Sequence, residues 1–146
     1  MKLFGLLSAA VIVAMSTSVN AEDTTIQMLN KDPSSKGRNI FSPALVQIEP
    51  GETVTWVATD RGHNVEFVRG AFPDGVSPLR SAIGKDVSYT FSTPGAYVYK
   101  CTPHYGMGMV GIIIVGETPD NLSEILAKKY PGKAEKRINT ILSPLT

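Results

Sequence analysis

Residue types that bind soft metal ions lie close together between positions 100 and 109 of this chain. Cys101 is the only cysteine, His104 is one of two histidines, and Met109 completes the spacing C-x-x-H-x-x-x-x-M. The second histidine, His63, lies 38 residues before the cysteine. Two imidazoles, a thiolate and a weak axial thioether are the donors of a blue-copper electron-transfer site. The residue types therefore predict one type 1 copper ion held by these four side chains.

The same residue types also allow interpretations without copper. A lone cysteine is most often a small buried hydrophobe, and a lone histidine is usually an ordinary surface or core residue. Structural zinc sites favour two to four cysteines, whereas this chain has one. A cysteine–histidine nucleophile pair is also conceivable, although nothing in the sequence marks a third, orienting group. The copper interpretation is favoured because it uses the cysteine and both histidines.

The predicted ligand set also bears on the class of function. Two imidazoles, a thiolate and a thioether accommodate Cu(I) and Cu(II) in nearly the same geometry. The ligands therefore need little rearrangement when an electron is gained or lost. All four positions are filled by protein, which leaves no open position for a substrate. We therefore expect an electron carrier and not an enzyme. The alternative from a different class is a periplasmic copper protein for delivery or storage, which would tend to use exchangeable sites rich in methionine or histidine.

Three segments of the sequence resemble the cupredoxin family, and within it the bacterial periplasmic pseudoazurins. They are Asp-Arg-Gly-His-Asn-Val-Glu at 60–66, Pro-Gly-Ala-Tyr at 94–97 and Lys-Cys-Thr-Pro-His-Tyr-Gly-Met-Gly-Met at 100–109. Plastocyanins share the ligand spacing, so the loop alone is less specific. The resemblance implies that Met109, and not Met107, is the axial ligand. It also implies that Asn64 bonds to the Cys101 loop and tunes the sulfur, as residues behind a ligand can.

The resemblance further implies how electrons leave the site. Pseudoazurins expose the edge of the histidine equivalent to His104 and surround it with basic residues that dock acidic redox partners, such as copper nitrite reductase. The matching basic residues here are Lys31, Arg61, Arg80 and Lys100, and Lys36, Arg38 and Arg69 extend the ring. Because side chains alternate along a strand and Cys101 is expected to point inward, we expect Lys100 to be exposed.

The first 21 residues have the features of a signal peptide. Lys2 provides a positive start, 3–13 is an apolar run, and Val19-Asn20-Ala21 offers small residues for cleavage. The sequence thus predicts a periplasmic domain at 22–146. A single cysteine in an oxidising compartment has no internal disulfide partner, and a bound metal would protect it.

The charge of the chain is balanced. The full sequence has 14 basic and 13 acidic residues, and removing Lys2 with the signal peptide leaves 13 of each. Overall charge therefore does not point to a polyanionic partner, and no nucleic-acid motif is evident. We expect a monomer that binds redox proteins, with no affinity for nucleic acid and none for a membrane after cleavage of the signal peptide.

Short apolar runs separated by turn residues predict an all-β domain. The resemblance makes this a Greek-key cupredoxin β-sandwich. The expected strands are 25–29, 44–48, 53–58 with Trp56 in the core, and 110–115, an unbroken apolar run that should be covered on both faces. The runs 87–91 and 96–101, joined by Thr93-Pro94-Gly95, predict a hairpin. Between them and the earlier strands, 69–85 should be loops.

The period of the apolar residues changes after Gly116. At about 119–143 it becomes helical and predicts two short amphipathic helices, with capping residues at 118–121. The apolar positions are Leu122, Ile125 and Leu126 in the first helix and Ala134, Ile138, Ile141 and Leu142 in the second. We expect both helices to pack on one side of the sandwich, and the alternative is a tail that binds a partner. Plastocyanins and azurins lack such a pair, whereas pseudoazurins have it.

Overall fold

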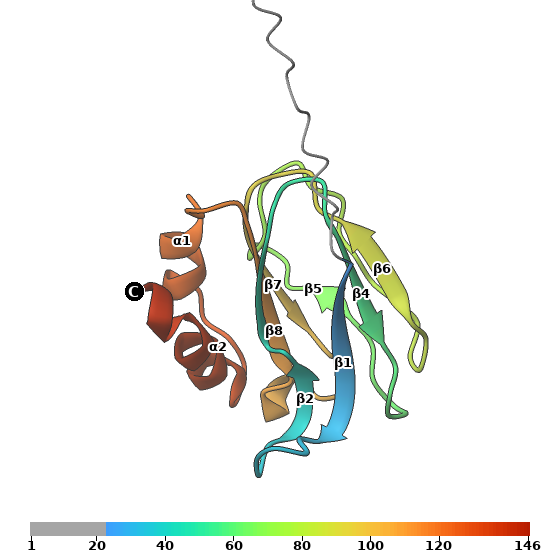
Figure 1. The fold of residues 1–146 in the computed structure, drawn as a ribbon. Helices are drawn as coiled ribbons and strands as arrows, with labels where there is room; N and C mark the ends of the chain where they lie inside the picture. The colour runs from blue at the N-terminus through green and yellow to red at the C-terminus, as the bar shows by residue number, and fades with distance from the viewer. Residues whose placement is uncertain (1–22) are drawn as a thin grey trace, which may run out of the picture.

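The computed structural model describes residues 23–146, so the predicted signal peptide at 1–21 lies outside the described residues. Within them, eight β-strands form two sheets that pack face to face, and two helices cover the outer face of one sheet (Figure 1). The prediction of an all-β sandwich with two C-terminal helices is confirmed.

The first sheet has the strand order β2-β1-β4-β6. Its strands are β1 (Thr24–Lys31), β2 (Arg38–Ser42), β4 (Thr53–Val57) and β6 (Val87–Thr90). Strand β1 runs antiparallel to β2 and parallel to β4, and β6 is antiparallel to β4. Trp56 of β4 is fully buried, as predicted.

The second sheet has the strand order β3-β8-β7-β5. Its strands are β3 (Leu45–Ile48), β5 (Glu66–Phe67), β7 (Gly95–Lys100) and β8 (Val110–Val115). All six residues of β8 are buried, because one face lies against the first sheet and the other lies under the helices. This confirms the prediction of a central strand covered on both faces.

The predicted hairpin between 87–91 and 96–101 is wrong. The first run forms β6 and pairs with β4, whereas the second forms β7 and pairs with β8 and β5 in the other sheet. Thr93-Pro94-Gly95 carries the chain across the sandwich. Both runs still bury an apolar face, because Phe91 and Tyr97 meet edge to face in the interior with ring centroids 4.9 Å apart. Alternation predicts a buried face, but it does not say which sheet the strand joins.

The two helices are α1 (Leu122–Ala127) and α2 (Ala134–Leu142). Ala134, Ile138 and Leu142 of α2 are buried in the same cluster as the outward side chains of β7 and β8. The helical tail is therefore part of the domain. No helix in the part of the chain that the structure describes has the length and apolarity needed to cross a membrane.

Two details of α1 differ from the prediction. Leu126 is 39% exposed, since only Ile125 of this short helix is fully buried. Asn121 precedes the helix, but its side chain does not cap it. The Asn121 side chain instead accepts a hydrogen bond from the backbone N–H of Ala96 (2.8 Å) and donates one to the Ala96 carbonyl (2.9 Å). These bonds tie the start of the tail to β7.

Candidate metal centre

Two chain segments bring the predicted ligands together at one end of the sandwich. The loop from Cys101 to Met109 joins β7 to β8, and His63 comes from the connection that leads into β5. In Figure 1 the loop is the orange turn at the lower end, between α2 and β2. The side chains of His63, Cys101 and His104 each place one donor atom within 4.8 Å of the others.

The separations between these donor atoms fit a single metal ion. The Nδ1 atoms of His63 and His104 are 3.1 Å apart. The Cys101 sulfur lies 3.7 Å from Nδ1 of His63 and 3.5 Å from Nδ1 of His104. Imidazole nitrogens and thiolates bind an ion such as zinc at about 2.0–2.3 Å, so donor atoms that share one ion lie roughly 3–4 Å apart. The three side chains can therefore bind copper without rearrangement.

Hydrogen bonds within the loop hold it in a compact shape. The N–H of Cys101 donates to the carbonyl of Met109 (3.0 Å), and the N–H of Met109 donates to the carbonyl of His104 (3.2 Å). A short 3₁₀ turn, Tyr105–Met107, closes at Gly108, whose φ of 91° is a left-handed conformation that glycine adopts readily. The loop thus fixes three of the four predicted ligands relative to one another.

Burial sets the protonation of two of these groups in the metal-free chain. Desolvation raises the pKa of the Cys101 thiol, although backbone hydrogen bonds from Asn64 and His104 oppose the shift. Desolvation also lowers the pKa of His63, the neighbouring His104 adds to this effect, and Asp60 opposes it. A neutral imidazole is the form that binds a metal. A bound cation would reverse the effect of burial on the cysteine, because it stabilises the thiolate.

Asn30 is a contributor to the site that the sequence did not reveal. Its side-chain oxygen lies 2.9 Å from Nε2 of His63. When this oxygen accepts a hydrogen bond from the protonated Nε2, Nδ1 of the same ring is left unprotonated and free to bind the metal. Asn30 lies in β1, 33 residues before the histidine. Nothing in the local sequence connects the two residues. At this end of β1, the sequence identified only the neighbouring Lys31, as a docking residue.

The two loop methionines have very different surroundings. Met109 is fully buried in the same core cluster as Cys101. Met107 is 56% exposed, and its sulfur lies 3.9 Å from the side-chain nitrogen of Asn39. Only Met109 is thus enclosed with the cysteine, as an axial ligand would have to be.

Asn64 connects the two segments that carry the site. Its side-chain oxygen accepts a hydrogen bond from the backbone N–H of Thr102 (2.7 Å), and its side-chain nitrogen donates to the Thr102 hydroxyl (3.1 Å). The predicted bond from Asn64 to the Cys101 loop is therefore present. That this bond tunes the sulfur remains a prediction.

The predicted basic ring is only partly as expected. Lys31, Arg61 and Arg80 are exposed. The prediction that Lys100 is exposed is wrong, because its side chain is only 20% exposed. That Lys100 takes part in docking remains a prediction. Its ammonium group lies 3.8 Å from a carboxylate oxygen of Glu66 and 4.8 Å from the centre of the Tyr105 ring.

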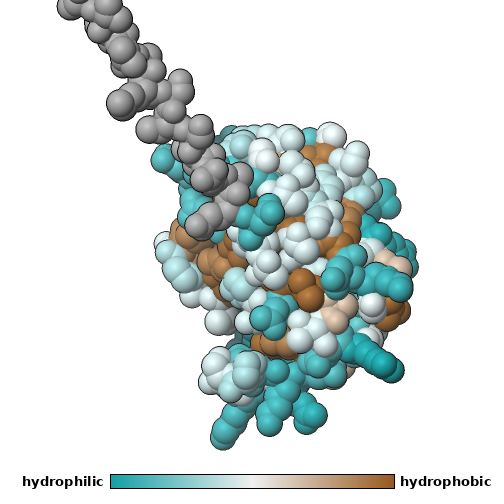
Figure 2. Space-filling view, turned by 45° about the vertical axis from the view of Figure 1, so that its right-hand side comes forward, coloured by the Kyte–Doolittle hydropathy of each residue, from teal (hydrophilic) through white to brown (hydrophobic). Residues whose placement is uncertain are grey.

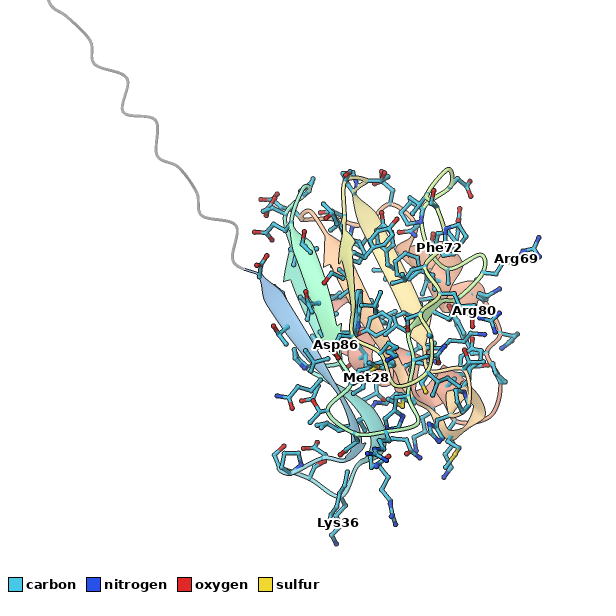
Figure 3. All side chains as sticks on the ribbon, turned by 90° about the vertical axis from the view of Figure 1, so that its right-hand side faces the viewer. Met28, Lys36, Arg69, Phe72, Arg80 and Asp86 are labelled. Atoms are coloured by element: carbon cyan, nitrogen blue, oxygen red, sulfur yellow. The ribbon has the colours of Figure 1, made fainter. Side chains whose placement is uncertain are left out.

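Glu66 belongs to β5, and strand alternation along β7 could not anticipate its position beside Lys100. The same carboxylate lies 3.9 Å from Arg80. In Figure 3, Arg80 and Arg69 lie along one side of the molecule, and Lys36 lies at its lower end. The basic residues therefore do not form one continuous ring of free charges.

Comparison with known proteins places this geometry in a family. Residues 27–116 match the model for copper-binding proteins of the plastocyanin/azurin family, and this match ends before the two helices. The pseudoazurin of Paracoccus pantotrophus is 40% identical over 93% of this chain and 92% of its own length, so the likeness continues into the tail. The chain belongs to the pseudoazurins of the plastocyanin/azurin family.

Solved pseudoazurin structures share the whole architecture. The structure from Hyphomicrobium denitrificans has a TM-score of 0.81 at 39% identity and covers 86% of this chain and 99% of its own. The structure from Methylobacterium extorquens AM1 has a TM-score of 0.80 at 34% identity, with 86% and 100% covered. The predicted cupredoxin fold is thereby confirmed. This pseudoazurin takes one type 1 copper ion, and His63, Cys101 and His104 cluster as its candidate site with Met109 nearby.

Proposed function

We propose that this pseudoazurin is a periplasmic electron carrier that passes single electrons to a redox protein, such as a copper nitrite reductase, through the edge of His104. The observation that carries the proposal is the convergence of Cys101 Sγ with Nδ1 of His63 and His104, in a chain whose Met109 is buried in the same core cluster as Cys101. When bound there, copper supplies a one-electron change between Cu(I) and Cu(II). The pseudoazurin relatives support the same class of function.

In this proposal His63, Cys101 and His104 are the strong ligands, and Met109 is the weak axial ligand. His63, Cys101 and Met109 are fully buried, whereas His104 is partly exposed. The imidazole of His104 is thus the one predicted ligand that reaches the surface. A ligand at the surface provides the shortest path from the metal to a docked protein.

The surroundings of His104 support protein docking. Pro103 and Met107 are exposed and Tyr105 is half-buried, so the loop offers a partly apolar surface beside the imidazole edge. In this proposal the exposed Lys31, Arg61 and Arg80 supply the positive charge of the docking surface. A basic rim accelerates encounter with an acidic partner.

The site is less suited to copper delivery or storage. Three of the four predicted ligands are completely shielded from solvent, which would hinder direct transfer of the ion to another protein. Hydrogen bonds within the loop further resist the opening that release would need.

A copper titration followed by rapid mixing tests the proposal. One equivalent of Cu(II) added to the metal-free chain should produce an intense visible absorption that saturates at one ion. The reduced protein should then lose its electron to oxidised copper nitrite reductase in a second-order reaction. The zinc-loaded protein is the control, since zinc has no accessible redox change. Colourless binding of several ions that a mild chelator removes quickly would contradict the carrier function and favour storage.

A further inference from the structure

The carboxylate of Glu66 bonds to the ligand loop, the segment from Cys101 to Met109, in addition to its salt bridges. Its Oε2 atom accepts a hydrogen bond from the hydroxyl of Thr102, at 2.7 Å. Thr102 directly follows the predicted ligand Cys101 in the chain. Among the carboxylates in the part of the chain that the structure describes, Glu66 alone is hydrogen-bonded to this loop. The contact therefore connects a charged residue of β5 to the metal centre.

Two neighbouring segments fix the position of this carboxylate. Glu66 pairs with Lys100 in the ladder between β5 and β7, and with Arg80 through an isolated bridge. The ammonium of Lys100 and the guanidinium of Arg80 lie 3.8 Å and 3.9 Å from Oε2, the same oxygen that accepts from Thr102. The Glu66 side chain is only 22% exposed. Backbone pairing with both segments and two positive charges thus hold this oxygen beside the loop.

Glu66 differs from the charged side chains that project into solvent near the site. Figure 2 shows hydrophilic side chains projecting from the lower end of the molecule, the end that carries the ligand loop in Figure 1. The side chain of Arg80 is 70% exposed, and Figure 3 shows it at the side of the molecule. The carboxylate of Glu66 instead faces the loop and contacts one of its residues. An effect on the metal centre is therefore expected of Glu66.

The carboxylate fixes the direction of the hydrogen bonds that follow it. An ionised carboxylate accepts hydrogen bonds and cannot donate them, so the single hydroxyl proton of Thr102 points to Glu66. The Thr102 oxygen is then left to accept, and the side-chain nitrogen of Asn64 donates to it at 3.1 Å. The Asn64 oxygen accepts from the backbone N–H of Thr102 at 2.7 Å. Glu66 therefore favours the one orientation of the Asn64 amide in which both of these bonds form.

Asn64 connects this orientation to the sulfur of Cys101. Asn64 is only 2% exposed, and its side-chain nitrogen also donates to the Ser81 carbonyl at 3.3 Å. A hydrogen bond from its backbone to the Cys101 sulfur opposes the rise that burial causes in the pKa of the thiol. Hydrogen bonds to the cysteine sulfur are one means by which a protein sets the reduction potential of a blue-copper site. A rotation of the Asn64 amide would move its backbone and weaken this bond.

We propose that Glu66 and Thr102 are positioning residues of the copper site, which raise its reduction potential by holding Asn64 in place beside Cys101. The hydrogen bond from Asn64 draws electron density from the thiolate, which then donates less to Cu(II), so the reduced state is favoured. Without the Glu66 carboxylate, the Thr102 hydroxyl is free to donate to the Asn64 oxygen or to water, and Asn64 loses its single preferred orientation. This inference rests on the ligand set of the proposed function, but not on the identity of the redox partner.

Removal of the Thr102 hydroxyl tests the inference in the copper-loaded full chain. Thr102→Val keeps the backbone N–H that bonds to Asn64 and the branched shape of the side chain, and Thr102 is exposed, so the variant should fold. Its reduction potential measured by voltammetry should fall, and its intense visible absorption band should shift. Competition with a chelator should show copper binding weakened by about tenfold, at the lower end of the effect of losing a group behind a metal ligand. Thr102→Ser restores the hydroxyl and should restore the potential. An unchanged potential in Thr102→Val would overturn the inference, as would a Thr102→Ser variant shifted equally far.

Two substitutions of Glu66 separate the hydrogen bond from the charge. Glu66→Ala and Glu66→Gln remove the same negative charge, but Gln keeps an oxygen that can accept from Thr102. The potential of Glu66→Ala should therefore be lower than that of Glu66→Gln, and equal potentials would contradict the inference. Thr55→Val is the matched control, because it removes a hydroxyl that is bonded to Ser88 at 2.7 Å in the other sheet. Its potential should equal that of the unmodified protein.

A measurement without redox chemistry separates the inference from the proposed function. In the zinc-loaded full chain, the NMR shifts of the Asn64 side-chain amide protons should change more in Glu66→Ala than in Glu66→Gln. If the unmodified chain gives no intense visible absorption with Cu(II), the ligand set of the proposed function fails, and these shifts still decide whether Glu66 orients Asn64. If the absorption appears but the shifts and the potentials of the two variants agree, the inference fails and the proposed function stands.

Discussion

The contact between Gly132 and Gly106 should be sensitive to a single methyl group. Gly132 has a φ of 55°, and a Cβ built on it would lie 2.3 Å from the carbonyl oxygen of Gly106 and 3.1 Å from its carbon. The obstacle is backbone, so no side-chain rotation relieves it. In Gly132→Ala either the ligand loop or the start of α2 must move, and the bond from Lys133 to Gly106 is strained or lost.

The loss of folding stability expected for Gly132→Ala can be estimated against a matched control variant. Gly75 also has a left-handed conformation (φ 78°), but a Cβ there would meet no atom within 4 Å. Gly75→Ala therefore carries only the conformational penalty of about 1–2 kcal/mol. Gly132→Ala adds overpacking, which costs about 1–3 kcal/mol. It also weakens one hydrogen bond worth about 1 kcal/mol. We expect it to be about 2–4 kcal/mol less stable than Gly75→Ala.

Urea unfolding of the metal-free proteins, followed by fluorescence of the buried Trp56, measures this difference. The slope of the free energy of unfolding against urea concentration should be the same for both variants, which would show that the cost lies in the folded state. Equal stability of Gly132→Ala and Gly75→Ala would refute the reasoning. It would mean that the tail yields to the methyl group and does not hold the ligand loop in place.

Three further outcomes are expected. Cys101→Ser should abolish the intense visible absorption with Cu(II) yet keep the β-sheet circular dichroism, and an intensely coloured variant would exclude Cys101 as the ligand. Met109→Gln should lower the reduction potential measured by voltammetry, because it replaces a soft donor by a harder oxygen, whereas Met107→Gln should change it little; the reverse order would show that the axial ligand is misassigned. Glu66→Gln should free the charge of Lys100 and speed transfer to an acidic partner by about two- to fivefold at low salt, and a slower rate in stopped flow would argue that Glu66 helps to hold the docking surface.

The ligand chemistry could be predicted from the sequence because it depends on residue types and on spacing within one loop. Cys101, His104 and Met109 occur within nine residues, and this closeness limits how far apart the loop can place them. The burial of Met109 and the exposure of Met107 are what distinguish them in the structure. Two residues apart in a turn, they differ in environment for reasons that no local pattern shows.

Strand and helix positions were likewise local properties. The segment 53–57, where apolar residues recur at every second position, forms β4, and the apolar run at 110–115 forms β8. The helical stripe of apolar residues from Ala134 to Leu142 lies on α2. The pairing of strands was not local. The runs on either side of Thr93-Pro94-Gly95 join different sheets. The first run, β6, pairs with β4, which lies much earlier in the chain, whereas the second run, β7, pairs with β8, which follows it.

The chain itself determined which donors are available for copper, which segments are strands or helices, and which faces of them are apolar, since these follow from residue type and from periods of a few residues. Only the tertiary structure decided which charges remain free. Glu66 comes from β5 to lie beside Lys100, and α2 brings Lys133 and Lys136 to the turn that carries Met107. Electrostatic interaction depends on distance in space, and chain folding sets that distance between residues that the sequence keeps far apart.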